Sequence, residues 1–231
     1  MRAPIYSIFP LQEIEQEIPK LYFRKFSHFK IRLLQLRLFQ PKSDDMVKFM
    51  MRLSCLHLFI KFAVMKILMV CLGNICRSPM AEGILKQKAK AAGLDWTLDS
   101  AGTNNSFHIG EAPHHLSQKV ARMHSIDISQ QRARSFRAED YEAFDKVYAM
   151  SKDVLQDIKY IAKKKYDPSK TDLLMNELFP GRNLDVPDPW YGPEPGYHEV
   201  FKLLDKACDK IIEHFLEQSD ELRQNSSKVG R

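Results

Sequence analysis

Short apolar runs alternate with segments of helical periodicity from residue 65 onward. Runs of strand length lie at residues 67–70, 96–101, 144–150 and 171–175. The first is continuously apolar, as in a central strand of a parallel sheet that is covered on both faces. Segments of helical pattern follow at residues 78–93, 117–124 and 154–164. This alternation predicts an α/β fold with ligands bound beyond the carboxyl ends of the strands.

The last third of the chain completes this pattern. Residues 184–197 are rich in proline and glycine and predict a rigid surface loop, whereas 198–217 carry apolar side chains at a 3.6-residue period and predict a closing amphipathic helix. Residues 219–231 are polar, and we expect a frayed tail there. The predicted domain therefore spans residues 65–218. Its fold class is a doubly wound, flavodoxin-like, four-stranded parallel sheet with helices on both faces.

The composition changes at about residue 65. Residues 1–64 hold 11 of the 35 Lys and Arg residues, 5 of the 29 Asp and Glu residues and 8 of the 14 Phe residues. The remaining 24 basic and 24 acidic residues balance, so the whole formal charge of +6 belongs to the first segment. No nucleic-acid partner is expected for the balanced part. Four cysteines without paired spacing favour a reducing cytoplasm over a secreted disulfide scaffold.

Three interpretations of residues 1–64 compete. Apolar and cationic residues interleave over 21–39, as in a segment on a membrane surface, so membrane contact is expected only if this extension is native. A targeting segment fits less well because Glu13, Glu15 and Glu17 are acidic. A spanning helix is disfavoured because charges interrupt residues 46–70. We favour translation from Met65, which mass spectrometry of the N-terminus tests, because peptides from residues 1–60 would refute it.

The segment from 66 to 79 joins the first apolar strand to a polar loop and a helix start. Cys71 ends the apolar run, a Gly-Asn loop follows, and Ser78 and Pro79 are expected as the cap and first residue of the helix. Backbone N–H groups and the positive end of the helix favour a thiolate and bind an oxyanion. A nucleophile and an anion site are therefore expected to coincide at Cys71.

The other loop residues suit the same chemistry. Gly73 lets the backbone approach an oxyanion, and Asn74 tolerates the left-handed conformation that turns N–H groups inward. Arg77 can fork onto two phosphate oxygens, and Ser78 can donate a hydrogen bond to the sulfur. Taken alone, a cysteine at a strand end is most often a small buried hydrophobe. The combination of strand, loop and helix start favours a functional site.

The run Cys-Leu-Gly-Asn-Ile-Cys-Arg-Ser-Pro at 71–79 resembles the signature of the low-molecular-weight protein tyrosine phosphatases. The resemblance covers residues 65 to about 217 and includes Asp-Ser-Ala-Gly-Thr at 99–103, Arg-Ala-Arg at 132–134 and Asp-Pro-Trp-Tyr-Gly at 188–192. It implies a metal-independent cytoplasmic hydrolase without a cofactor. The implied substrates are phosphotyrosine-containing proteins or small aryl phosphates, and we expect a monomer or weak dimer.

The resemblance also implies roles for individual residues. Cys71 would attack phosphorus and form a phosphocysteine, Arg77 would bind the phosphoryl oxygens, and Asp188 would protonate the leaving phenol and then activate water. Asn74 and Ser100 would brace the loop. The phosphate-binding loop positions would be Leu72, Gly73, Asn74, Ile75, Cys76 and Ser78. The aromatic walls of the substrate cleft would be Phe107, Trp190 and Tyr191.

The roles of Asp188 and Cys76 are inferred from the family resemblance alone. Without it, Asp188 before a proline would be interpreted as a turn former. The family counterpart of Cys76 forms a reversible disulfide with the nucleophile under oxidation, which protects it from deeper oxidation. Cys55 and Cys208 are expected to be structural, the latter within the apolar stripe of the last helix.

Several positions depart from the family pattern. Many relatives carry a His where this chain has Gln131, an Asp where it has Ser151 and an Asn where it has Val154. They also commonly have an acidic turn where this chain has His-His-Leu at 114–116. We expect these changes to alter rate or partner choice without abolishing activity. The two adjacent histidines have no further metal ligands at a suitable spacing, so we expect both side chains to be solvated at the surface and not to bind a metal.

Three alternative functions share the loop. Arsenate reductases on this fold relay electrons through further cysteines, but none lies between Arg77 and Cys208. Phosphoarginine phosphatases usually carry a Thr at the position of Ile75. A non-catalytic phosphate-binding adaptor would be expected to have lost Cys71, Arg77 or Asp188, and all three are present.

Overall fold

The computed structural model describes residues 64–104, 106 and 108–228, without the side chains of 222, 223 and 225–228. The predictions for residues 1–63, including Cys55, and for Phe107 lie outside this part of the chain. Four parallel strands form one sheet in the order β2-β1-β3-β4. Their bounds are Lys66–Cys71 for β1, Thr97–Gly102 for β2, Lys146–Ala149 for β3 and Thr171–Leu173 for β4. The predicted parallel α/β sheet is confirmed.

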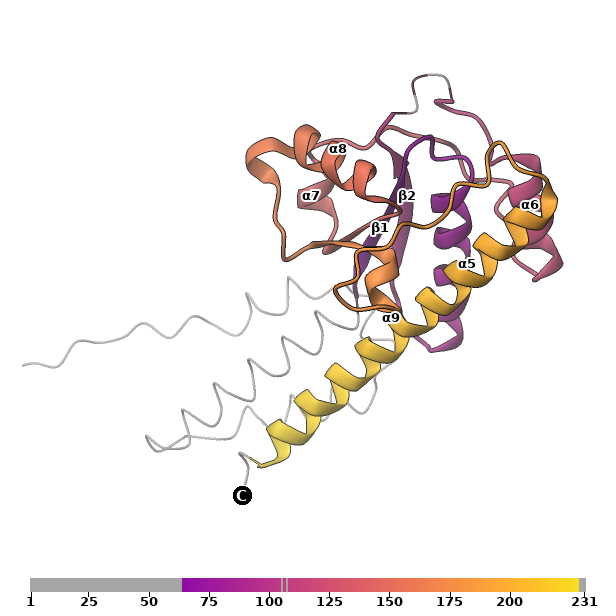
Figure 1. Cartoon of the computed structure of the whole chain (residues 1–231). Helices are drawn as coiled ribbons and strands as arrows, with labels where there is room; N and C mark the ends of the chain where they lie inside the picture. The colour runs from indigo at the N-terminus through magenta and orange to yellow at the C-terminus, as the bar shows by residue number, and fades with distance from the viewer. Residues whose placement is uncertain (1–63, 105, 107, 229–231) are drawn as a thin grey trace, which may run out of the picture. The chain divides into compact units, whose positions relative to one another are not determined.

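Helices cover both faces of this sheet (Figure 1). Alternate residues of β1 supply the two cores: Ile67 and Met69 belong to one, and Leu68 and Val70 to the other. The first core includes side chains from α5 (Arg77–Ala91), α6 (His115–Met123) and α9 (Glu194–Lys228). The second includes side chains from α7 (Asp140–Ala143) and α8 (Lys152–Ala162). This is the doubly wound arrangement, and Cys71 stands at the carboxyl end of its central strand.

The element boundaries differ from the predicted ones. Strands β3 and β4 are shorter than expected. Phe144, the first residue predicted for β3, is the C-cap of the helix that ends at Ala143, and a 3₁₀ turn at Leu174–Glu177 ends β4 early. A further 3₁₀ turn at Lys163–Lys165 follows α8. The short helix α7 was not predicted, since four residues carry too little periodicity to be recognised.

Helix α9 begins earlier and ends later than its apolar period indicates. It starts at Glu194, where an acidic residue and a proline suit a first helical turn. It continues to Lys228 through most of the segment expected to fray, because no glycine or proline lies between Gly196 and Gly230 to end it. Among the described helices, none combines the length and apolar character needed to cross a bilayer.

Candidate active site

The loop of residues 72–76 connects the end of β1 to the start of α5. The helix begins at Arg77, and the cap position falls on Cys76 without a side-chain cap hydrogen bond, so the predictions of Ser78 as cap and Pro79 as first residue were wrong. The reason is that the Ser78 hydroxyl is turned to the Cys71 sulfur, at 3.0 Å, instead of to a backbone N–H. The backbone donors at this helix start thereby remain available to an anion.

Cys71 lies buried at the mouth of this loop, with 2% of its surface exposed. The backbone N–H of Asn74 donates to the sulfur at 3.2 Å, in addition to the contact with Ser78. Both partners are hydrogen-bond donors to a thiolate, and the sulfur sits at the N-terminal end of α5. Two hydrogen-bonding partners and the N-terminal end of α5 therefore converge on the sulfur.

Asn74 holds the loop in its turned conformation. Its φ of 56° lies in the left-handed region that Asn tolerates. Its side chain is buried, accepts a hydrogen bond from the backbone N–H of Arg134 at 2.9 Å, and donates to Ser78 at 3.0 Å and to Ser100 at 2.9 Å. The predicted bracing by Asn74 and Ser100 thus has a direct geometric basis.

Arg77 and Asp188 meet although they are far apart in the sequence. Arg77 Nη2 lies 2.6 Å from Asp188 Oδ2, and Nη1 donates to the carbonyl of Val186 at 3.2 Å. The Arg77 side chain is 7% exposed, whereas that of Asp188 is 44% exposed. The backbone N–H of Trp190 donates to Asp188 Oδ1 at 3.1 Å and fixes the carboxylate further. A half-exposed acid therefore lies against a buried guanidinium at the edge of the loop.

Aromatic rings gather beside this pair. Trp190 has the ring of His108 at 5.3 Å and that of His114 at 5.2 Å, and Tyr191 follows with 98% of its surface exposed. His114 also stacks on Tyr197 at 5.3 Å and an interplanar angle of 14°. Partial burial, together with the neighbouring imidazole of residue 115, lowers the pKa of His114. The prediction of a solvated surface side chain was therefore wrong for His114, which packs against the rings of Trp190 and Tyr197.

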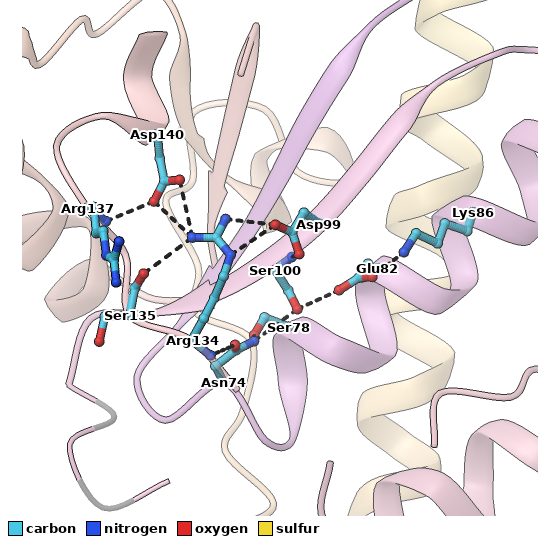
Figure 2. Close-up of polar contacts among 10 residues, drawn as sticks. All are labelled: Asn74, Ser78, Glu82, Lys86, Asp99, Ser100, Arg134, Ser135, Arg137 and Asp140. Carbon is cyan, nitrogen blue, oxygen red and sulfur yellow. Dashed lines mark hydrogen bonds and ion pairs between the residues drawn. The ribbon is translucent and has the colours of Figure 1, made fainter. Parts of the chain in front are cut away.

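Two further charged groups lie behind the loop, and the predicted catalytic set did not contain them (Figure 2). Arg134 donates to Asp99 Oδ2 at 2.9 Å and to both oxygens of Asp140, at 3.2 and 3.1 Å. Glu82 is buried and accepts from the Ser100 hydroxyl at 2.6 Å. The sequence offers only weak signals, since Arg134 belongs to a matched motif and Glu82 stands where an acidic residue near a helix start ordinarily serves the helix dipole. In the structure, Glu82 lies beyond the first turn of α5, and its carboxylate accepts the hydrogen bond from Ser100.

The departures from the family pattern lie in different surroundings. Gln131 lines an open pocket together with Glu82, and Val154 is fully buried in the second core. Ser151 occupies the cap position of α8 without a side-chain cap hydrogen bond. Partial burial opposes the charge of Asp153, but hydrogen bonding at the start of α8 and the positive charge of Arg77 outweigh it and lower its pKa. An acidic group near Arg77 is thus present, two residues after Ser151.

The other two cysteines that the structure describes, Cys76 and Cys208, are buried. Burial is the main cause that raises the pKa of Cys76 to about 12, and its sulfur lies 3.8 Å from the Tyr197 hydroxyl. Cys208 is completely buried in the first core, as expected of a structural residue. Within the residues that the structure describes, no three His, Cys, Asp or Glu side chains converge as a metal site requires.

The sequence of this chain is similar to that of known phosphatases. Residues 66–225 match the family described as low molecular weight phosphotyrosine protein phosphatase. The Bacillus subtilis low molecular weight protein-tyrosine-phosphatase YfkJ is 34% identical over 151 residues, which cover 64% of this chain and 94% of the relative. The phosphotyrosine protein phosphatase of Gallus gallus is 30% identical over 152 residues, or 65% and 95% of the two chains.

Two solved structures have a similar fold. The crystal structure of Bacillus subtilis YfkJ aligns with a TM-score of 0.61 and 32% identity over 67% of this chain and 96% of its own. A structure of the YwlE arginine phosphatase, with a phosphorylated serine at its mutated active site, aligns with a TM-score of 0.61 and 26% identity over 68% and 99%. The fold is therefore shared by phosphatases named for two different phosphorylated amino acids.

Proposed function

Because the chain belongs to the low molecular weight phosphotyrosine protein phosphatase family, a family of hydrolases, we propose that it hydrolyses phosphotyrosine in proteins, or small aryl phosphates, through a cysteinyl-phosphate. One observation carries the proposal: the Cys71 sulfur receives two hydrogen bonds beside the paired Arg77 and Asp188. Nucleophile, anion-binding cation and acid thus converge on one loop.

The chemistry follows from these contacts. The Cys71 thiolate forms the S–P bond as the P–O bond to the aryl group breaks, and Asp188 gives its proton to the departing phenolate. Arg77 and the loop N–H groups stabilise the oxygens of the phosphoryl group in transfer. The Asp188 carboxylate then takes a proton from water, whose oxygen forms the new bond to phosphorus as the S–P bond breaks. Ser78 stabilises the departing thiolate.

The substrate choice rests on the walls of the site. Trp190 and the exposed ring of Tyr191 suit an aromatic leaving group, which can stack on them. Ile75 is a buried residue of the loop, at the position where phosphoarginine phosphatases usually carry Thr. The structural likeness to YwlE makes phosphoarginine the second candidate substrate. A cytoplasmic location and the redox role of Cys76 stay predictions.

Single-turnover hydrolysis of matched phosphotyrosine and phosphoarginine peptides tests the proposal. Cys71→Ser should abolish turnover of both peptides, and Asp188→Asn should slow the phosphotyrosine reaction by about 10²–10⁴-fold, the usual contribution of a general acid. Asp209→Asn, an exposed acid on α9, is the matched control. Unchanged hydrolysis in Cys71→Ser would refute the mechanism, and faster hydrolysis of phosphoarginine by the wild type would refute the substrate assignment.

A further inference from the structure

His114 lies where three segments of the site meet. Its backbone N–H donates to the carbonyl of Ile75, in the loop that follows the nucleophile, at 2.8 Å. Its ring stacks on that of Tyr197, in the first turn of α9, with 5.3 Å between the ring centres. The ring of Trp190 lies 5.2 Å away at an interplanar angle of 61°. The backbone of His114 is thus fixed to the phosphate-binding loop, and its side chain contacts the late loop that carries the acid.

Trp190 connects this ring to the acid. Its backbone N–H donates to Asp188 Oδ1 at 3.1 Å, and the turn is closed by a hydrogen bond from the N–H of Gly192 to the carbonyl of Pro189 at 2.8 Å. The residue that contacts His114 through its ring therefore holds Asp188 through its backbone. Because the Asp188 side chain is 44% exposed, packing around the carboxylate itself constrains it little. The position of Trp190 matters correspondingly more.

The geometry indicates that the His114 ring is neutral. Its Nδ1 atom lies 3.4 Å from the backbone nitrogen of Leu116 at the start of α6. A backbone N–H can only donate, so Nδ1 accepts and carries no proton. Partial burial and the neighbouring imidazole of His115 lower the pKa of His114, which agrees with this state. A neutral ring adds no charge beside Asp188, so it can act on the acid only through its position.

A second histidine of the same helix shows what a purely structural stack looks like. His124, at the opposite end of α6, stacks on Phe201 of α9 at 4.1 Å and an interplanar angle of 14°. His114 stacks on α9 at the same angle, so both rings join α6 to α9. The two lie about 15 Å apart along the helix. The contact with Trp190 distinguishes His114, because the rings found against Trp190 in the described part of the chain are those of residues 108, 114 and 191.

We infer that His114 is a positioning residue for the acid: its ring holds Trp190, and the backbone N–H of Trp190 in turn orients Asp188. The inference rests on the proposed function, because it takes Asp188 as the general acid. His114 does not touch the reacting atoms. The step that it affects is the transfer of the Asp188 proton to the aryl oxygen as the P–O bond breaks. Its removal should therefore slow only those substrates whose leaving group needs that proton.

Two aryl phosphates of different leaving-group basicity test this in the full chain. Phenyl phosphate releases a basic phenolate that needs a proton, whereas the weakly basic phenolate of dinitrophenyl phosphate leaves without one. His114→Asn keeps a good acceptor at the start of α6 but removes the ring. It should lower kcat/KM for phenyl phosphate about threefold to tenfold, the effect of one lost aromatic contact, and change that for dinitrophenyl phosphate less than about twofold. His114→Phe keeps a ring without the acceptor and should retain the wild-type kcat/KM for both.

Two further variants locate the effect. His124→Asn, the matched control, loses a stack of the same kind between α6 and α9 and should leave the ratio of the two kcat/KM values unchanged. Asp188→Asn removes the proton donor, so His114→Asn should cause no further loss in that background. The inference is overturned if His114→Asn slows neither substrate or both equally, if His114→Phe slows phenyl phosphate as much as His114→Asn does, or if the loss persists in the double variant.

Acrylamide quenching of Trp190 fluorescence separates this inference from the proposed function, because it needs no turnover. The chain has 2 Trp residues, and Trp96→Phe isolates the signal without loss of a hydrogen bond, since Nε1 of Trp96 has no partner among the described residues. In that background His114→Asn should raise the quenching constant about 1.5-fold, because one of three neighbouring rings is lost, and His124→Asn should not. Unchanged quenching in His114→Asn would overturn the inference. If Cys71→Ser retained hydrolysis, the proposed function would fail, whereas quenching would still decide whether His114 holds Trp190.

Discussion

Replacing Asn74 with Ala should destabilise the fold and the loop together. The change removes two donated hydrogen bonds and leaves the backbone N–H of Arg134 without its acceptor. It also places Ala at a φ of 56°, a conformation that costs an ordinary L-residue about 1 kcal/mol. With about 1 kcal/mol for each of the three lost pairs, the free energy of unfolding should fall by about 3–4 kcal/mol.

Urea denaturation of the full chain, followed by far-ultraviolet circular dichroism, measures this loss. A slope of about 2 kcal/mol per molar urea converts it to a midpoint lower by about 1.5–2 M. Asn74→Gly is the matched control, because Gly adopts positive φ without strain but makes none of the side-chain contacts. It should recover about 1 kcal/mol relative to Ala. The reasoning fails if Ala lies within about 0.5 kcal/mol of the wild type, or if Gly is no better than Ala.

Three further predictions concern the surroundings of the loop. Asp153→Asn should lower kcat/KM by about threefold to tenfold and reduce stability at neutral pH. Because folding lowers the pKa of Asp153, this stability difference should be fully present above the ordinary aspartate pKa of about 3.9 and should shrink as the pH falls below it, which unfolding at stepped pH checks. Gly83→Ala should lower the free energy of unfolding by about 1 kcal/mol in spite of the better helix propensity, since the new Cβ would lie 2.6 Å from the Cγ2 atom of Ile128, and a stabilised variant would contradict this packing. Tyr191→Ala should leave thermal unfolding unchanged but raise KM for an aryl phosphate about threefold to tenfold, and an unchanged KM would remove Tyr191 from the cleft wall.

The parts of the site that could be predicted are those encoded locally. The apolar run before Cys71, the Gly-Asn loop and the following helical pattern are contiguous, so strand, loop and helix follow from periodicity alone. Asp188 was found only through a family motif, because nothing in its own neighbourhood distinguishes an acid from a turn former. Its contact with Arg77 depends on how the loop before α9 returns to the sheet.

The parts that could not be predicted depend on packing between distant elements. His114 is a surface residue by composition, and only the start of α9 brings Tyr197 against its ring. The sequence alone allows Glu82 a place in the first turn of the helix, because it does not fix the exact first residue of α5. Its true partner, Ser100, comes from a different strand.

The register of the sheet explains why Ser100 reaches the loop around the sulfur. Ser100 pairs with Met69 in the parallel ladder between β1 and β2, and the neighbouring Ala101 belongs to the opposite core. A shift of β2 by one residue would turn Ser100 away from Asn74 and Glu82, because successive side chains of a strand point to opposite faces. Asn74 would then lose Ser100 as a partner although every loop residue remained. The loop that surrounds the nucleophile is therefore braced by the pairing of β2 as well as by its own residues.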